Sequence, residues 1–399
     1  MKTFDQALSH LIEQATPSQK TTSVSLNEAV GKTLAEDIIS PINVPPHDNS
    51  MMDGYAIAIH SLKNATSLPV SQRIAAGEIG KPLQAGTVAR IFTGAAIPEN
   101  VDAVVMQEQT EVLNDKSIKF EQNLAKKYPR GLNIRRKGED IAKNNVILRK
   151  GHCLKSQDIG LIASVGFNEV LVYQPLTIAT FTTGCELIEP GKSLEVGKIF
   201  NANRYFLASE IPNSGFSLID LGVVEDTLKA TTEAMQQASK IADVVITTGG
   251  VSVGEEDHIK PAIEQLGQLD MWKVKMKPGK PLAYGHINKT PFIGLPGNPV
   301  SAFATFKLFA LPYLKTMQGQ IDVVPKPIYL KAKFETNKAQ FRREFARGKI
   351  INHSGETQVE LYSNQGSGVL SSTVWADGFV VIPEDTVIQQ GDKIAFYYF

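Results

Sequence analysis

The chain has 399 residues, which is too long for one hydrophobic core and predicts roughly two to four domains. Lysine plus arginine and aspartate plus glutamate both total 41, so the formal net charge is zero. This balance excludes a general polyanion-coating protein such as a nucleic-acid binder, and any anion site must be built locally. No apolar run approaches the ~20 residues of a membrane span.

Cysteine and histidine usage indicates the compartment and excludes one kind of metal site. Cys153 and Cys185 have no metal-type spacing, and the seven histidines include no HxxxH pair, so a zinc site is not expected. The cysteines are expected to be reduced thiols in a cytoplasmic protein. Phe4, Leu8 and Leu11 fall on one side of the N-terminal segment, which predicts an amphipathic helix. The segment lacks the apolar core of a signal peptide.

The first 173 residues are predicted to form two domains. Residues 1–40 are expected to be mostly helical, with Ser25 and Glu28 in a capping box, until several prolines mark a boundary. Residues 41–140 are expected to be a β-rich inserted domain, with strands at 74–77, 88–92, 103–106 and 117–120. Residues 141–173 are expected to rejoin residues 1–40 as a linking α/β domain.

Two segments of the inserted domain contain polar side chains with more than one interpretation. Asp53 precedes Gly54, a pair typical of a hairpin turn. Arg135, Arg136 and Lys137 either face a phosphate or form a solvated edge.

Residues 174–324 alternate strands with helices, which predicts a central, doubly wound and mostly parallel α/β domain. Strands are expected at 176–181, 217–221, 243–247, 272–276 and 291–295, and helices at 203–211, 228–239, 259–266 and 300–317. Ligands in such sheets bind beyond the carboxyl ends of the strands.

Residues 325–399 are predicted to form a small C-terminal β-barrel, with strands at 378–382 and 393–399. Within it, residues 341–348 are basic and aromatic. A nucleic-acid patch has that composition, but the neutral chain favours a structural turn.

A glycine-rich turn at 247–257 is the segment around which the chain is organised. Gly249, Gly250 and Gly254 allow positive φ and close approach to a ligand, and exposed N–H groups there can hold an anion. Three carboxylates follow, ending in Asp257. They would repel a phosphate unless a cation such as Mg²⁺ lay between them. The alternative is a helix N-terminus with acidic caps.

Lysines alternate with apolar residues just before the last strand of this domain. A period of two places Lys273, Lys275 and Lys277 on one face, and Lys280 follows a Pro-Gly turn. Three like charges on one face repel unless anions lie opposite. The alternative is an exposed edge strand protected by lysines, which suits Lys275 best.

Together these features favour a phosphorylated, metal-bridged small ligand. Hydride transfer is not expected, because no GxGxxG fingerprint is present. No Ser-His-Asp or Cys-His arrangement stands out, and Cys185 is better interpreted as a small buried thiol than as a nucleophile. The expected chemistry is phosphate or oxyanion handling by positioning and electrostatics.

Several segments, in order and over nearly the whole chain, resemble the molybdopterin molybdenumtransferase family, which includes the C-terminal part of gephyrin. They are DNSMMDGYA (48–56), FTGA (92–95), AVVMQEQT (103–110), NIRRKGED (133–140), TTGCEL (182–187), TGGVSVGE (248–255), KPGKP (277–281) and GLPGNPVS (294–301). Each is weak alone, and the ordered set is specific.

The resemblance implies an L-shaped homodimer with four domains per subunit. It implies that adenylated molybdopterin and molybdate are converted, with Mg²⁺, to molybdenum cofactor and AMP. A molybdopterin adenylyltransferase is the implied substrate donor, and molybdoenzymes or a carrier are the implied acceptors. Neither a nucleic-acid nor a membrane partner is expected.

The resemblance also implies roles for individual residues. The implied metal ligands are Glu186, Asp226 and Asp257. The implied catalytic residues are Asp53, Thr93, Asp140, Asp257, Lys273 and Lys277, with Asp53 and Thr93 reaching the partner subunit's site. The implied substrate-binding residues are Arg135, Gly249, Gly250, Ser252, Gly254, Lys280, Pro296, Pro299 and Ser367.

Two departures and two alternatives accompany the resemblance. Cys185 stands where the family usually has Asp, and His258 stands where Tyr is common. A nicotinamide-nucleotide amidohydrolase or pyrophosphatase would share a similar central domain, but would leave Asp53 and Thr93 unexplained. A non-catalytic pterin-binding scaffold would be expected to have long linkers or a fused domain.

Overall fold

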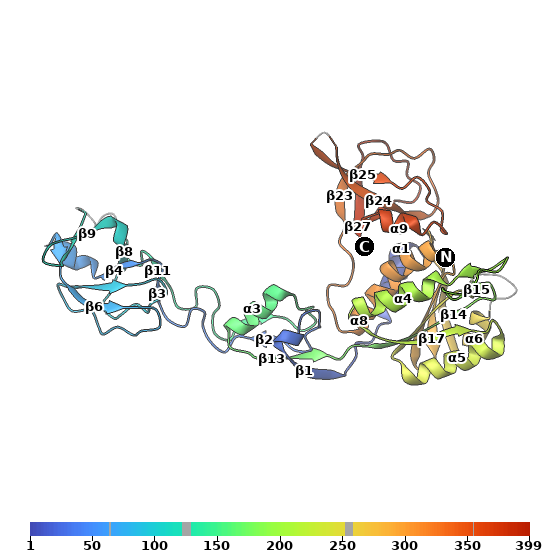
Figure 1. Ribbon diagram of the computed structural model, residues 1–399, viewed down its shortest axis with the longest axis horizontal. Coiled ribbons are helices and arrows are strands. Elements are labelled where there is room, and N and C mark those ends of the chain that lie inside the picture. Colours follow the sequence, from blue (N-terminus) through green and yellow to red (C-terminus); the bar gives the residue numbers. More distant parts are fainter. Residues whose placement is uncertain (64, 122–128, 252–257, 354) are drawn as a thin grey trace.

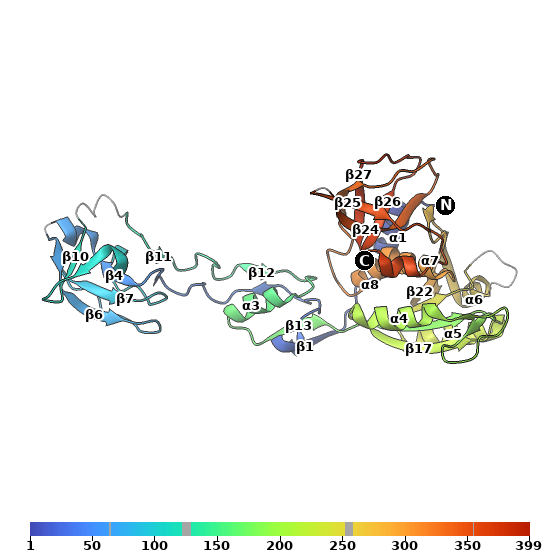
Figure 2. The ribbon, with the colours of Figure 1, turned by 45° about the horizontal axis from the view of Figure 1, so that its top comes forward.

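The computed structural model describes residues 1–63, 65–121, 129–251, 258–353 and 355–399. The molecule is extended (Figure 1): the β-rich unit lies at one end, a small linking unit follows, and the central α/β domain lies at the other end. The C-terminal barrel stands on the central domain, beside α1 and α7, as Figure 2 shows from a second direction. The multidomain α/β-plus-β class is thus confirmed.

The central domain is built on a six-stranded sheet in the order β17-β14-β18-β22-β21-β19. Four neighbouring strands are parallel, namely β17 (Ser217–Val224), β14 (Thr177–Thr183), β18 (Val244–Thr248) and β22 (Thr290–Leu295). The two inner strands β14 and β18 are buried along nearly their whole length, as strands covered on both faces require. The expected doubly wound, mostly parallel sheet is present.

Helices cover both faces of this sheet. On one face, α5 (Leu228–Ile241) and α6 (Ile259–Leu266) pack on Ala179 and Phe181 of β14. On the other face, Ile178 contacts the core formed by α4 (Ala202–Asn213), α7 (Pro299–Thr305), the π-helical turn Phe306–Ala310 and α8 (Leu311–Met317). The alternation of side chains along one strand therefore builds both cores.

The remaining two strands differ from the expected ones. β21 (Pro281–Ile287) was not expected, and it pairs antiparallel with both β22 and β19. The expected strand at 272–276 was wrong in its limits, since β19 spans Gly267–Lys273 and is followed by the short strand β20 (Met276–Lys277). A short apolar segment can be placed in a sheet only once its partners are known.

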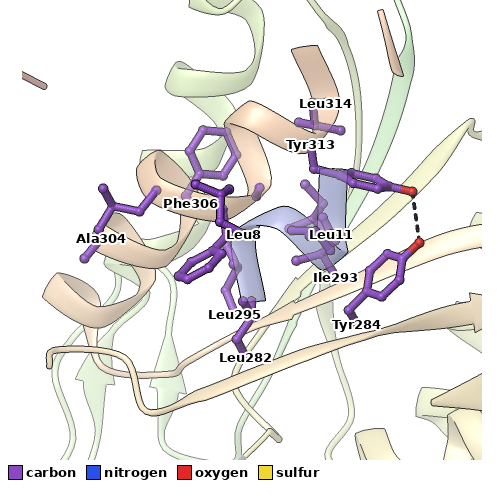
Figure 3. Packing of buried hydrophobic residues seen from close by; sticks show 14 of the residues in the cluster. Leu8, Leu11, Leu282, Tyr284, Ile293, Leu295, Ala304, Phe306, Tyr313 and Leu314 are labelled. Carbon is purple, nitrogen blue, oxygen red and sulfur yellow. Dashed lines mark hydrogen bonds between the residues drawn. The ribbon is translucent and has the colours of Figure 1, made fainter. Parts of the chain in front are cut away.

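Helix α1 (Phe4–Glu13) begins with a capping box in which the Thr3 side chain accepts from the Gln6 amide. Its apolar side lies in the central core, where Phe4 meets Phe309 and Phe345 with ring centroids 5.0 and 4.7 Å apart. Figure 3 shows Leu8 and Leu11 of α1 between the helices and strands β21 and β22. Although adjacent in sequence to the linking unit, α1 therefore packs with the central domain and the barrel.

The linking unit contains more strand than expected. Beyond α1, the prediction that residues 1–40 are mostly helical is wrong, since β1 (Thr21–Ser25) pairs with β13 (Glu169–Tyr173) and β2 (Ile38–Ile39) pairs with β12 (Val146–Leu148). Ser25 Oγ does contact Glu28 Oε2 at 3.0 Å, but the helical segment Leu26–Glu28 is a single 3₁₀ turn. Helix α3 (Ser156–Ser164) supplies the helical part of this α/β unit.

The β-rich unit contains a four-stranded sheet in the order β6-β7-β4-β8 and a three-stranded sheet in the order β5-β10-β9. Gly54 opens a strand instead of a hairpin turn. The bounds are β3 (Asn49–Ser50), β4 (Gly54–Ile57), β5 (Ser67–Leu68), β6 (Val70–Ile74), β7 (Val88–Ile91), β8 (Ala103–Met106), β9 (Thr110–Val112), β10 (Ile118–Phe120) and β11 (Ile134–Arg135).

The C-terminal unit is a closed five-stranded barrel, as expected, because β24 pairs with both β25 and β26. Its strands are β23 (Ile328–Ala332), β24 (Arg343–His353), β25 (Glu356–Leu361), β26 (Gly378–Ile382) and β27 (Lys393–Tyr398). The expected turn at 341–348 was wrong, because most of this segment is β24 and Arg347 is fully buried within it.

In the part of the chain that the structure describes, no helix combines the length and apolarity needed to cross a bilayer. Neither cysteine is in a disulfide: Cys153 is half-buried and Cys185 is exposed.

Docking of α1 can be tested by removing one side chain. Leu11 is fully buried, so Leu11→Ala is expected to lower the free energy of unfolding by about 3 kcal/mol. Glu13→Ala, on the exposed side of the same helix, is expected to change it by less than about 0.5 kcal/mol. Chemical denaturation measures both, and equal effects would mean that α1 is not docked.

Candidate functional site

Two glycines following β18 allow three strand ends to meet at the carboxyl edge of the central sheet. Gly249 has φ +86°, and its amide donates to the Leu295 carbonyl at the end of β22. A Cβ on Gly249 would lie 2.6 Å from the Thr183 carbonyl oxygen at the end of β14. Gly250 has φ +62°, and a Cβ there would lie 2.7 Å from Ile259 of α6. Both positions therefore require glycine.

A small pocket of about 80 Å³ opens at this edge. Its wall brings together Glu186, Gly249 and Pro299 from the predicted set. Thr183, Thr248, Asn203 and Gly297 also contribute to it. The pocket therefore gathers one carboxylate with several hydroxyl, amide and backbone groups, and Leu187, Ile199 and Phe200 form its apolar part.

Asp226 reaches the same edge through a hydrogen bond. Its Oδ1 accepts from the Thr183 hydroxyl at 2.7 Å, and Thr183 is buried at the wall of the pocket. The Glu186 carboxylate lies over Gly184, where a Cβ would meet Oε2 at 2.7 Å. Cys185 is exposed between them in sequence, and its carbonyl accepts from Lys198 at 2.6 Å.

These donors are hard oxygens, which are the ligands that Mg²⁺ prefers. Over the described ranges, no three His, Cys, Asp or Glu side chains come close enough to hold a metal ion. Three of the predicted residues, Ser252, Gly254 and Asp257, lie outside the described residues.

The predicted alternation of the lysine segment is present. Val274 and Met276 are buried, whereas Lys273, Lys275 and Lys277 are partly exposed. Lys277 Nζ lies 2.9 Å from Glu344 Oε1 of the barrel, and Lys275 Nζ lies 5.9 Å from the centre of the Phe341 ring. Lys275 and Lys277 therefore face the C-terminal barrel, which supplies a carboxylate for Lys277.

The pairing register of the strands also places the lysine segment at the carboxyl edge of the central sheet. Lys273 pairs with Pro281, and β19 runs parallel to β22 because β21 is antiparallel to both. β14 and β19 are four strands apart, so about 19 Å of sheet edge separates the Glu186 end from the Lys273 end. The edge therefore suits an elongated ligand with negative charge along its length.

Three separate segments meet at α7. Pro296 belongs to the loop that enters the helix, and Pro299 is its first residue. The Val300 amide donates to the Ser367 carbonyl of the barrel at 3.0 Å. The turn before Lys280 packs on the same helix, since a Cβ on Gly279 would meet Thr305 at 2.6 Å.

Asp53 and Thr93 form a pair in the inserted domain, far from this edge (Figure 1). Asp53 Oδ1 accepts from the Thr93 amide at 2.8 Å and from its hydroxyl at 2.7 Å. These two bonds hold the pKa of the Asp53 carboxyl below its ordinary value, with a smaller contribution from Arg90. Asp53 is therefore fixed as an anion above mildly acidic pH.

Arg135 and Asp140 line a groove of about 430 Å³ in the inserted domain, with Val44, Pro45 and Glu139. Arg135 is exposed there. Arg136, by contrast, is engaged within the fold, because its guanidinium lies 2.7 Å from the Asp48 carboxylate. The basic run is therefore part structural and part open to a ligand.

Two arginines beside Asp53 were not expected. Arg73 and Arg90 are paired on neighbouring strands, and both guanidinium groups lie over the Phe92 ring, 4.5 and 4.6 Å from its centre. Arg90 also donates to the Gly54 carbonyl at 3.1 Å. Their sequence positions, in β6 and β7, gave only a weak signal of this pair, because the two arginines come together only when these strands pair. Thr183 and Thr248 could have been found as polar residues ending buried strands, whereas Asn203 had no signal.

Three family descriptions match the chain. "MoeA N-terminal region (domain I and II)" matches residues 2–166, "Probable molybdopterin binding domain" matches residues 179–316, and "MoeA C-terminal region (domain IV)" matches residues 329–399.

Curated relatives and solved structures are similar over nearly the full length. A molybdopterin molybdenumtransferase of Haemophilus influenzae is 40% identical over 392 residues, covering 96% of this chain and 95% of the relative. One of Bacillus subtilis is 32% identical, covering 91% and 86%. The crystal structure of the molybdopterin biosynthesis moeA protein from Pyrococcus horikoshii OT3 superposes with a TM-score of 0.83 at 29% identity, covering 100% of both chains.

The strand-end constraint predicts unequal effects of two glycine substitutions. Gly191 has φ +92° and open space around it, so Gly191→Ala is expected to add only backbone strain of about 1 kcal/mol. Gly249→Ala adds a clash with the Thr183 carbonyl, so its loss of unfolding free energy is expected to be larger by at least about 2 kcal/mol. Chemical denaturation compares them, and matching losses would contradict the geometry.

Proposed function

Because the chain belongs to the molybdopterin molybdenumtransferase family, we propose that it inserts molybdate into adenylated molybdopterin and releases molybdenum cofactor and AMP. The observation that carries this proposal is the mixed-charge carboxyl edge of the central sheet. Carboxylates lie at the Glu186 end, lysines lie at the Lys273 end, and Gly249 and Gly250 follow β18 between them.

The chain's own groups act by positioning and charge. Lys273, Lys277 and Lys280 hold the anionic parts of the substrates, and the loop with Pro296 and Pro299 orients the pterin. Glu344 fixes the Lys277 ammonium, which is 33% exposed and so remains accessible to an anion. Breaking the phosphoanhydride releases AMP as the pterin dithiolene ligates molybdenum. The residues supply electrostatic stabilisation that is in place before the reaction.

Mg²⁺ is the metal that the donor set favours. Glu186, Asp226 and Asp257 would hold it, and it would supply Lewis-acid polarisation of a phosphate oxygen. Thr183 orients Asp226 for this role through its hydroxyl.

The active assembly is proposed to be a homodimer in which each inserted domain completes the partner's site. Asp53, Thr93 and Arg135 belong to the β-rich unit, and Asp140 lines a groove with Arg135. That unit lies at the opposite end of the molecule from the central domain, which carries Glu186 and Lys273 (Figure 1). One chain in this conformation does not bring both groups to one substrate, so a second copy is the simplest source.

We propose that the protein works in the cytoplasm. A molybdopterin adenylyltransferase would supply the substrate, and molybdoenzymes or a carrier would accept the product. Nicotinamide mononucleotide hydrolysis is the competing activity, and incubation with that nucleotide discriminates between the two.

The direct assay combines purified protein, adenylated molybdopterin, molybdate and Mg²⁺ and measures AMP. Lys277→Ala and Asp257→Ala are each expected to lower the rate by about 100-fold, a larger effect than their effect on stability. Lys275→Ala is the matched control, because that lysine lies against Phe341. The proposal fails if AMP release never exceeds the metal-free control, or if activity and melting temperature fall in parallel.

Sharing of the site between subunits is tested by mixing inactive variants. Asp53→Asn and Lys277→Ala affect different domains, so randomly formed mixed dimers retain one intact site. The mixture is expected to recover roughly a quarter of the unmodified activity. Asp53→Asn mixed with Thr93→Val is the control and should recover none, since both changes fall on the same inserted domain. Absence of recovery in the first mixture would place the whole site within one chain.

A further inference from the structure

A cavity of about 920 Å³ lies where the linking unit, the central domain and the barrel meet. Its wall includes residues 30–33, Cys153 and residues 322–326. Pro175 precedes β14, and the cavity also takes in the end of α4, so it lies at the amino edge of the central sheet. It is therefore separate from the carboxyl-edge site, and its volume is in the usual range for small-molecule sites.

The carboxylates on this wall are already engaged. Glu210 Oε1 lies 2.6 Å from Lys307 Nζ, and Asp322 Oδ2 lies 2.8 Å from Lys326 Nζ. Each pair is neutral overall, so neither carboxylate is available to neutralise the other charged side chains of the wall.

Three further lysines line the cavity, namely Lys32, Lys155 and Lys315. Among the described residues, Lys32 and Lys315 have no ion pair, and Lys155 has only the proximity of Asp158, whose carboxylate is bound to His152 at 2.7 Å. In a chain of zero net charge, this is a local excess of positive charge.

Cys153 and several rings complete the wall. Burial raises the pKa of the Cys153 thiol, while the charges of Lys315 and Lys155, which line the same cavity, lower it. Tyr397 is half-buried and Tyr398 is exposed beside them. Aromatic faces next to lysines can stack a base while the ammoniums bind a phosphate.

We propose that this cavity binds a nucleoside phosphate, with Lys32 and Lys315 holding the phosphate and the C-terminal tyrosines contacting the base. The ligand would contact the linking unit, the central domain and the barrel. It would also contact residues 322–326, which connect the central domain to the barrel. This site is independent of the proposed reaction and of the residues assigned to it.

The two cysteines provide separate reporters for the two sites. Cys185→Ser leaves only Cys153, at the cavity, and Cys153→Ser leaves only Cys185, beside Glu186 at the carboxyl edge. The rate of modification by a thiol reagent is measured with AMP, adenosine or inorganic phosphate present. AMP is expected to slow modification of Cys153 about tenfold at saturation, and adenosine and phosphate each to act much more weakly.

Substitutions at the wall identify the binding groups. Lys32→Gln and Lys315→Gln are each expected to weaken AMP protection of Cys153 about tenfold. Lys326→Gln, whose lysine is already paired with Asp322, is the matched control and should change it less than about twofold.

Three results would overturn the proposal. One is protection of Cys185 without protection of Cys153, which would assign AMP to the carboxyl edge alone. Another is unchanged protection in the Lys32→Gln, Lys315→Gln double variant. The third is protection by adenosine or phosphate alone that equals protection by AMP.

Discussion

The close approach of backbone at the ends of β14, β18 and β22 is the constraint on which the candidate site depends. Gly249 fits between the Thr183 carbonyl and the Leu295 carbonyl only because it has no side chain. This contact brings Thr183 and Glu186 to one pocket, and the Thr183 hydroxyl bonds the Asp226 carboxylate beside it. Charge and backbone N–H groups are gathered there because parallel strands end at the same edge.

Helix α7 performs a similar role at the lysine end. It follows the loop that contains Pro296, contacts the Gly279 turn and, through Val300, bonds the Ser367 loop of the barrel. The barrel in turn supplies Glu344 to Lys277. The C-terminal unit is thus part of the site's framework, and its position on α1 and α7 rests on an aromatic core that includes Phe4, Phe309 and Phe345.

Much of the central domain could be predicted from sequence, because buried parallel strands and amphipathic helices have strong patterns. α6, β8 and β26 were predicted with their actual bounds, and Gly249 and Gly250 do follow a buried strand, β18. β21 was missed, and β24 was taken for a turn, since a short or charged strand depends on its partners. Arg347 illustrates the reason: a buried guanidinium is specified by Ser372 and Gly366, which follow it by about twenty residues.

The sequence by itself determined which chemical groups follow each strand, because local pattern and glycine conformation are properties of short segments. It also determined the alternation of Lys273, Lys275 and Lys277. Only the tertiary structure decided which groups meet: Thr183 with Asp226, Lys277 with Glu344, and Arg73 with Arg90 over Phe92. It also separated Asp53 from Glu186 by most of the length of the molecule, because pairing between distant segments, and not their order, sets position in space.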